Sequence, residues 1–277
     1  MPSRSLIFPV LAALLSVQMA SATPIVEVVP RSDVTLQPLN PLRGDASPKA
    51  GVLWGDIKQD VPTGTLIEFV DGFSSPPHIH NITYRAVVLS GLVHNDDPEA
   101  GKLWMGPGSF WTQPAGENHI TAAKPGDKAT AFLEILEGPY LVQPASEEFD
   151  NGERPVNLEA RNVVWLDASD AGWITGDSGA EMAFLWGTPQ PGELNGTFLR
   201  LPAGGRGELA GNPSWLRAVL IDGEVSHRVE GVTSPAFLQP GSYFGAKGGA
   251  VHELTCGADA PCVLYLRTEG RYGFSAD

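Results

Sequence analysis

Three histidines are spaced so that β-structure can bring them to one point. His78 and His80 lie two residues apart, and side chains two apart on a strand share one face of the sheet. A later strand can place His119 opposite them. Because neutral imidazole is a favoured ligand for Zn, Fe, Cu and Ni, this pattern predicts a β-barrel with a metal site inside it.

The residues around these histidines follow two regular spacings. The first run has Gly72, His78, His80, Tyr84 and Gly91, and the second has Gly108, Pro114, Gly116 and His119. Together they resemble the two signature motifs of the cupin superfamily, G-x5-H-x-H-x3,4-E-x6-G and G-x5-P-x-G-x2-H-x3-N. The resemblance implies a jelly-roll barrel, also called a double-stranded β-helix, in which the three histidines bind a divalent metal.

Two residues depart from the cupin pattern. Tyr84 stands where the family has a glutamate ligand, and Ala123 stands at the final asparagine. A three-His site without the carboxylate is similar to the non-haem iron dioxygenase branch of the cupins, such as the cysteine and β-diketone dioxygenases. This likeness implies Fe(II) or Zn as the metal, with Mn, Ni and Cu as alternatives.

The Tyr84 hydroxyl has three roles open to it at this position. It can ligate the metal, form a hydrogen bond with a metal-bound water, or fill space. We expect the second role, because a phenol with an ordinary pKa near ~10 ionises only under strong metal influence.

The chain repeats itself at an offset of 132 residues (186 − 54 = 132), which becomes 133 after one inserted residue. Trp54-Gly55 returns as Trp186-Gly187, Arg85 as Arg217, Gly91 as Gly223, Pro107-Gly108 as Pro240-Gly241, and His119 as His252. One register covers nearly the whole of each half, so the sequence predicts an internal duplication.

Each half carries short apolar runs separated by Gly, Pro, Asn and Asp, which is typical of many short antiparallel strands. We therefore expect an all-β chain of two tandem cupin barrels, a bicupin. The predicted divisions are an N-terminal barrel over 45–142, a linker over 143–162 and a C-terminal barrel over 163–277. Two runs, Ser75 to Asn81 and Thr112 to Glu117, also resemble an exported, uncharacterised bacterial bicupin family.

The second half lacks the histidine cluster. In the shared register, Ala210, Asn212 and Leu216 stand where the first half has His78, His80 and Tyr84. Only His252 remains, and a single imidazole is more often a hydrogen-bonded core or rim residue than a ligand. We therefore expect a metal site in the first barrel alone, with the second barrel as a brace or an oligomer interface.

The first residues have the features of an export signal. Arg4 precedes an apolar stretch from Leu6 to Val17, and Ala20-Ser21-Ala22 is a small-x-small cleavage site. The alternative, an uncleaved membrane anchor, is disfavoured because the apolar stretch is short for a bilayer. We expect a signal peptide over residues 1–22 and a periplasmic or secreted protein.

The charge balance narrows the range of partners. The chain has 18 Lys and Arg against 32 Asp and Glu, a net charge of −14. This acidity argues against nucleic acid and against anionic membrane surfaces. A small-molecule substrate or ligand, and a second copy of the chain in a homo-oligomer, are the partners that remain.

The two cysteines flank a turn-forming run. Cys256 and Cys262 are predicted to close a hairpin as a disulfide, since exported proteins form such bridges. Free thiols or a thiolate metal site are the alternatives.

Other residues near the motifs are weaker candidates. Glu117 is a nearby carboxylate that can act as general base or as partner of a ligand, or simply be a solvated loop residue. His94, if paired with Val87 across a turn at Ser90-Gly91, is expected to face outward. Four aromatic residues are either pocket lining or barrel core: Phe73, Trp104, Phe110 and Trp111.

Three functions fit these features. The leading one is an exported metalloenzyme acting on a small molecule, either dioxygenase-like or hydrolase- or lyase-like, with Tyr84 and Glu117 as catalytic residues. The second is a module that binds or senses a metal or small ligand without turnover. The third is a structural scaffold, and an open coordination position favours the first two over it.

Overall fold

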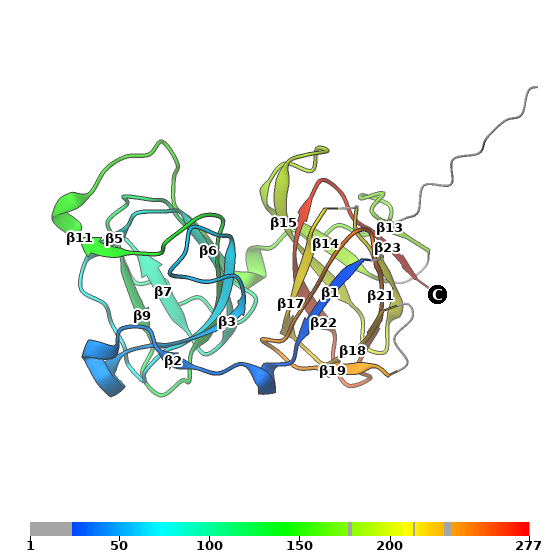
Figure 1. Ribbon diagram of the computed structural model, residues 1–277, viewed down its shortest axis with the longest axis horizontal. Helices are drawn as coiled ribbons and strands as arrows, with labels where there is room; N and C mark the ends of the chain where they lie inside the picture. Colours follow the sequence, from blue (N-terminus) through cyan, green and yellow to red (C-terminus); the bar gives the residue numbers. More distant parts are fainter. Residues whose placement is uncertain (1–23, 177–178, 213, 230–233, 277) are drawn as a thin grey trace, which may run out of the picture.

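The computed structural model describes residues 24–176, 179–212, 214–229 and 234–276. Two β-barrels lie side by side, which confirms the all-β architecture predicted from the sequence (Figure 1). The predicted signal peptide, residues 1–22, lies outside the described residues. Within those residues no helix has the length and apolar character needed to cross a membrane.

The first barrel consists of one large sheet and two small ribbons. The large sheet has the strand order β12-β8-β6-β10-β4-β3-β2, and the ribbons are β11-β5 and β7-β9. The strands are β2 (Gln37–Pro38), β3 (Lys49–Trp54), β4 (Thr63–Glu68), β5 (His78–His80), β6 (Tyr84–Ser90), β7 (Val93–Asp96), β8 (Phe110–Gln113), β9 (Ile120–Ala123), β10 (Thr130–Ile135), β11 (Val142–Pro144) and β12 (Val156–Leu158). Backbone bridges between Ser74 and Ala122 and between His78 and His119 join the ribbons into the second face of the barrel.

The second barrel has two sheets, with strand orders β1-β20-β17-β22-β15-β14 and β13-β23-β16-β21-β18-β19. The strands are β1 (Ile25–Val29), β13 (Ile174–Thr175), β14 (Glu181–Gly187), β15 (Leu194–Leu201), β16 (Arg206–Ala210), β17 (Leu216–Asp222), β18 (Val225–Val229), β19 (Ala236–Leu238), β20 (Tyr243–Lys247), β21 (Val251–Cys256), β22 (Cys262–Glu269) and β23 (Gly273–Ala276). The Cys256–Cys262 disulfide links the end of β21 to the start of β22, which confirms the predicted bridge.

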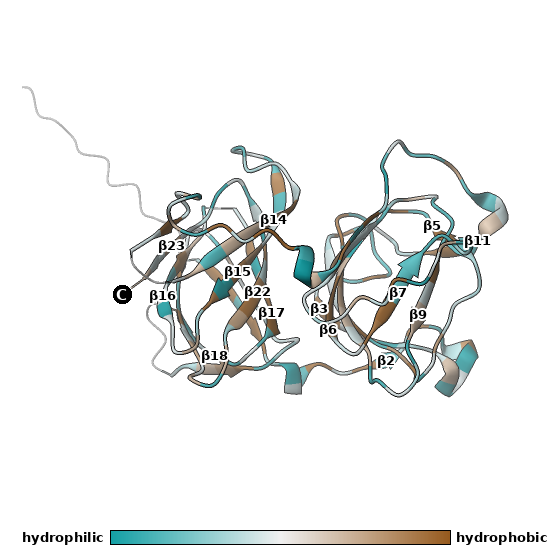
Figure 2. Cartoon of the chain, turned by 180° about the vertical axis from the view of Figure 1, so that it is seen from behind, coloured by the Kyte–Doolittle hydropathy of each residue, from teal (hydrophilic) through white to brown (hydrophobic). Residues whose placement is uncertain are grey.

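Four short 3-10 helices complete the described elements. They are η1 (Arg31–Asp33), η2 (Pro41–Ala46), η3 (Ala145–Glu147) and η4 (Ala160–Asn162). Figure 2 shows that the strands of both barrels carry most of the apolar stretches.

Each barrel is completed by a strand from the segment that precedes the other barrel. β1, at the N-terminal end, pairs with β20 of the second barrel, and β12 pairs with β8 of the first barrel. Residues 143–162, predicted as the linker between the barrels, therefore include a strand that pairs with the first barrel. β12 covers the edge of β8, whose backbone N–H and C=O groups lack partners on that side without it. A strand of three residues is too short to give a periodic signal in the sequence.

An apolar layer joins the two barrels. Val87, Phe110 and Phe132 of the first barrel belong to one core cluster with Phe198, Val219 and Tyr265 of the second. The alternate residues on the same strands of the first barrel, such as Ala86 and Trp111, face its interior instead. Strands β6, β8 and β10 are thus buried on both faces, and this explains their continuous apolar runs.

Residues that recur in the two halves of the sequence build this interface. Gly64 leaves room for the ring of Trp54, since a Cβ there would lie 2.3 Å from the ring. Arg217 of the second barrel lies over the Trp54 ring at 5.0 Å, and Arg85 of the first barrel lies over the Trp186 ring at 4.1 Å. These reciprocal cation–π contacts account for the recurrence of Trp and Arg in both halves.

A carboxylate lies in the same layer. Glu134 on β10 is fully buried, accepts a hydrogen bond from the Tyr265 hydroxyl, and lies 3.9 Å from the Arg267 guanidinium. Burial raises the pKa of the Glu134 carboxyl, and Arg267 opposes that rise.

Removing this carboxylate should destabilise the chain. Glu134→Ala is expected to lower the free energy of unfolding by about 3–5 kcal/mol, because Arg267 is then buried without its partner. The measurement is chemical denaturation followed by tryptophan fluorescence. As a control, Glu253→Ala removes an exposed ion pair with Arg228 and should cost no more than about 1 kcal/mol. Equal losses in the two variants would contradict the buried-pair account.

Candidate metal centre

The three histidines meet inside the first barrel, as the motif spacing predicts. The backbones of His78 and His119 lie directly opposite each other, with N–H to O=C hydrogen bonds of 3.1 and 3.0 Å. His80 is on the same strand as His78 and on the same face. The ring centroids are 4.3 to 5.2 Å apart, and one ring nitrogen from each residue lies within 4.8 Å of the others. All three residues are buried.

Backbone carbonyls fix the orientation of each ring. The Nδ1 atoms of His78, His80 and His119 lie 2.9, 2.8 and 3.0 Å from the carbonyl oxygens of Pro76, Leu141 and Glu117, respectively. A carbonyl oxygen only accepts, so each Nδ1 carries the hydrogen and donates it. The neutral ring then has its lone pair on Nε2.

The Nε2 atoms of His78 and His80 face each other at 3.2 Å. With the hydrogens on Nδ1, this contact brings two lone pairs together and is not a hydrogen bond. The Nε2 atom of His119 is 3.5 Å from the Tyr84 hydroxyl, whose own hydrogen goes to Asn95. Converging lone pairs with fixed ring orientations are the donor set that a divalent transition ion requires, so the residues fit a metal.

The histidines are also held in the neutral form that binds metal. Burial lowers the pKa of His78, and it lowers the pKa of His119 to about 3. Burial, together with the nearby His119 and His78, holds the pKa of His80 well below its usual range. The rings therefore need no deprotonation at neutral pH before they ligate an ion.

Tyr84 lies beside the cluster, at the position where most cupins have a carboxylate. Its hydroxyl donates to Asn95 Oδ1 at 2.8 Å, and burial raises its pKa to about 12. Asn95 also accepts from Thr121 at 2.6 Å and donates to Gln113 at 2.8 Å. The phenol is thus a neutral group held next to His119 by a fully paired polar network.

Tyr140 is a second phenol at the cluster, and the motif analysis does not identify it. Its ring stacks on His80 with a centroid distance of 4.3 Å, and its hydroxyl lies 3.0 Å from His80 Nε2. Burial raises the Tyr140 pKa well above its usual value, so this hydroxyl is also a neutral donor. It reaches the site because β11, just after it, pairs with the strand that carries His80.

Glu117 contributes its backbone to the cluster. Its carbonyl accepts from His119 Nδ1 and, at 3.1 Å, from Gln113 Nε2. Its carboxylate instead lines a second cavity, together with Asp97, Asn118, Glu148, Asp150 and Arg154. This placement gives no support to the predicted role of Glu117 as a general base beside the metal.

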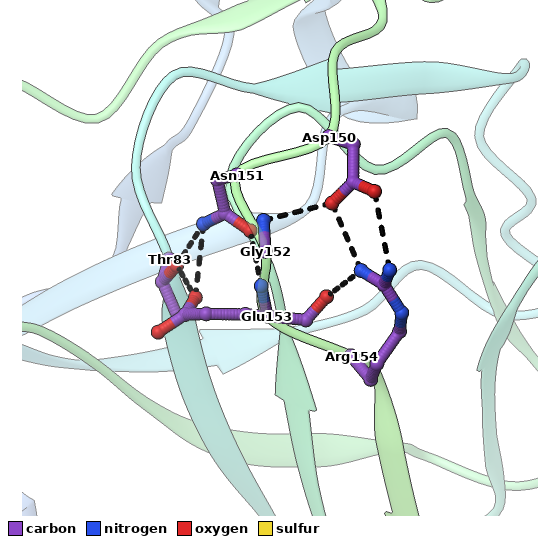
Figure 3. A network of polar contacts seen from close by, with 6 residues as sticks. All are labelled: Thr83, Asp150, Asn151, Gly152, Glu153 and Arg154. Atoms are coloured by element: carbon purple, nitrogen blue, oxygen red, sulfur yellow. Dashed lines mark hydrogen bonds and ion pairs between the residues drawn. The ribbon is translucent and has the colours of Figure 1, made fainter.

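The segment after β11 is linked through Thr83 to the loop of the second motif. Figure 3 shows Thr83 bonded to Glu153, while the Arg154 guanidinium donates to both Asp150 oxygens at 2.9 and 3.1 Å. Thr83 Oγ1 also accepts from the backbone N–H of Ala115 at 3.0 Å. The loop before His119 is therefore held in place from outside the barrel.

The structure explains why the second motif has a glycine at position 116. Its φ is +78°, and a Cβ would lie 2.3 Å from the carbonyl oxygen of Phe149. Its N–H donates to the His80 carbonyl at 2.8 Å. A glycine is thus needed where the loop passes close to the strand of the ligands.

A largely apolar cavity of about 480 Å³ leads to His78 and His80. Of the four aromatic residues near the motifs, Phe73 and Trp111 line it. Phe110 packs between the barrels, and Trp104 lies 6.0 Å from the His94 ring. Further lining residues are Leu39, Ile67, Phe69, Tyr84, Ala131, Leu133, Tyr140 and Val142.

His94 does not join the cluster. It lies on β7, which pairs with β9 and places His94 opposite Ala122, so the predicted pairing with Val87 is wrong. The alternate residue, Asn95, faces Tyr84. His94 is nevertheless buried, with Nδ1 3.3 Å from the Leu103 carbonyl, and is not a surface histidine.

The second barrel has no equivalent cluster among its described residues. The prediction that His252 stands alone is wrong, because a second histidine lies beside it. His227 Nε2 lies 2.9 Å from His252 Nδ1, and both residues are buried. In the strand register, His227 takes the position that Asn95 has in the first barrel. Leu209 lies opposite His252, just as His78 lies opposite His119 in the first barrel. An ordinary hydrogen bond between two imidazoles replaces the converging lone pairs.

The chain thus has a cupin-like double-barrel fold, and the three histidines of its first barrel form a candidate metal centre. The chain belongs to the family described as "Domain of unknown function (DUF4437)", whose model matches residues 27–275. A search of curated proteins finds no match.

Solved structures with the same fold are only distantly similar in sequence. Salicylate 1,2-dioxygenase from Pseudoaminobacter salicylatoxidans is 14% identical, with 94% of this chain and 87% of that chain covered and a TM-score of 0.59. Oxalate decarboxylase from Lactobacillus farciminis is 12% identical, with 91% and 88% covered and a TM-score of 0.57. Vicilin from Corylus avellana is 11% identical, with 89% and 87% covered and a TM-score of 0.56. These similarities establish the fold and no more.

The histidine pair of the second barrel predicts an acid-sensitive stability. Burial lowers the pKa of His227 to about 3 and that of His252 to about 4, against an unfolded value of about 6.5. The stability they confer is present above about pH 6.5 and is lost as the pH falls, because the unfolded chain then takes up protons first. Replacing both by leucine should reduce the fall in unfolding free energy between about pH 7.5 and about pH 5.5 by about 1–3 kcal/mol. If the unfolding free energy falls by the same amount with pH in the parent protein and in the double variant, the two histidines do not cause the acid sensitivity.

Proposed function

We propose that the first barrel holds one divalent first-row transition ion on His78, His80 and His119 and acts on a small, mostly apolar molecule in the adjoining cavity. The observation that carries the proposal is the convergence of three Nε2 lone pairs at the end of an apolar cavity. The three-His donor set, without a carboxylate, favours a dioxygenase-like reaction on Fe(II), and Zn-dependent hydrolase- or lyase-like chemistry is the alternative.

When bound, Fe(II) supplies neighbouring open positions for substrate and dioxygen, and Zn supplies Lewis acidity. The protein's own groups bind and orient. Tyr84 and Tyr140 present neutral hydroxyl groups beside the histidines, with ring centroids 5.9 Å apart. The Tyr140 hydroxyl can donate to a substrate oxygen, and the Tyr84 oxygen, whose own hydrogen goes to Asn95, can accept from a substrate hydroxyl. The apolar walls exclude water and so strengthen these polar contacts.

The remaining features support an exported enzyme with one working barrel. A disulfide between Cys256 and Cys262 and the signal-like residues 1–22 both favour the periplasm or the exterior. The recurrence of framework residues favours a duplicated origin in which the second barrel lost its ligands and braces the first. A metal-binding or sensing module without turnover is the alternative that an activity screen separates from an enzyme.

Metal content tests the centre. Mature protein is expected to carry about one equivalent of a first-row transition metal per chain, and His78→Ala with His80→Ala should remove it. His252→Ala is the matched control, because it removes a buried imidazole that is hydrogen-bonded to His227 and lies outside the three-histidine cluster, and it should keep the metal. Elemental analysis after anaerobic purification, followed by dioxygen consumption with small carbonyl compounds, provides the measurement. Equal metal in all variants would end the proposal.

The Tyr140 hydroxyl should affect the affinity of the site for its metal ion. Tyr140→Phe keeps the ring stacked on His80 and removes the hydroxyl that lies 3.0 Å from Nε2, where it competes with the ion for the same lone pair, so metal affinity should rise by up to about tenfold. Competition with a fluorescent chelator measures this affinity. Tyr272→Phe removes a buried hydroxyl of the second barrel near Thr197 and should leave it unchanged. The same affinity in Tyr140→Phe and the parent protein would exclude this role.

A further inference from the structure

The cavity of the first barrel has one charged lining residue, Arg43, and no acidic one. Arg43 belongs to η2. This helix, blue in Figure 1, lies at the edge of the first barrel away from the second. Among the described residues no acidic side chain forms an ion pair with Arg43, and its guanidinium lies 5.5 Å from the Phe73 ring centroid. A guanidinium that borders an apolar cavity and has no protein counter-ion is suited to bind a carboxylate of a ligand.

Hydrogen bonds hold the segment that carries Arg43. Asn40 Oδ1 accepts from the Leu42 N–H at 3.0 Å, and the Asn40 N–H donates to Ser47 Oγ at 2.9 Å. Asn40 and Ser47 line the same cavity as Arg43. Because Asn40 Oδ1 is occupied, its Nδ2 group, which has no partner among the described residues, remains to donate to a ligand.

Between Arg43 and the histidines the walls are aromatic. The Phe69 and Phe73 rings lie 5.9 Å apart, and Trp111 and Tyr140 also line the cavity. A volume of about 480 Å³ falls in the range of small-molecule sites and suits one ring-bearing molecule.

We propose that the cavity selects a ring-bearing monocarboxylate. The carboxylate binds Arg43 and the Asn40 Nδ2 group, the apolar body lies against Phe69 and Phe73, and the other end faces the histidines. A single cation in an otherwise uncharged lining matches a single negative charge. The assignment rests on the proposed function only for what happens at the inner end, because the carboxylate contacts do not require the metal.

The test compares two probes of the same shape, 3-phenylpropionate and its neutral amide, by isothermal titration calorimetry. Zinc-loaded and chelator-treated protein are both titrated. The carboxylate is expected to bind about tenfold more tightly than the amide in both forms, and Arg43→Gln should abolish that preference. Arg43→Lys should retain part of it. Arg161→Gln, which changes an exposed arginine paired with Glu159 outside the cavity, should leave it unchanged.

The outcomes separate this inference from the proposed function. A carboxylate preference that survives Arg43→Gln and disappears when the metal is removed would overturn the inference, since the ion then holds the anion, and the proposed function would stand. An Arg43-dependent preference in protein that never binds metal would support the inference and refute the proposed function. Equal binding of the two probes, or no binding of either at millimolar concentration, would overturn the inference.

Discussion

Three backbone carbonyls determine what the first barrel can do. By accepting the Nδ1 hydrogens of His78, His80 and His119, they turn the Nε2 lone pairs toward one point, where the Tyr140 hydroxyl is the donor beside His80. Without an ion this arrangement is repulsive, so the surrounding fold must hold it. It is held by the direct backbone pairing of His78 with His119, by β11 alongside β5, and by the loop that Gly116 allows to pass close to His80. In the second barrel, which has a similar fold, two imidazoles form a hydrogen bond with each other instead of turning their lone pairs toward one point.

The two barrels are joined by an extensive packed interface. Their large sheets share an apolar layer, each receives a strand from the segment preceding the other, and Arg85 and Arg217 cross the interface to the tryptophans of the opposite barrel. The sheet that lines the cavity on one face is thus anchored on its other face by the second barrel. Tyr84 and Trp111, which line the cavity, belong to paired strands of this sheet.

The sequence predicts those features that depend on local spacing. The alternation around His78 and His80 and the glycines of the two motifs suffice to place three histidines together, and the turn-rich segments suffice for an all-β chain. Tyr140, Asn95 and Arg43 escape prediction because they reach the site through pairings between distant strands or through a short 3-10 segment, and no periodicity marks such contacts. The partner of His252 does not follow from the ligand positions either, because His227 occupies the place of Asn95, which is not a ligand position.

Anomalous diffraction from crystals of the metal-loaded protein, recorded at the absorption edge of the metal found by elemental analysis, tests the central claim most directly. The account predicts one peak in the first barrel, about 2.0–2.2 Å from the Nε2 atoms of His78, His80 and His119. An empty position there would contradict it, as would a peak confined to the acidic cavity lined by Glu117 and Asp150.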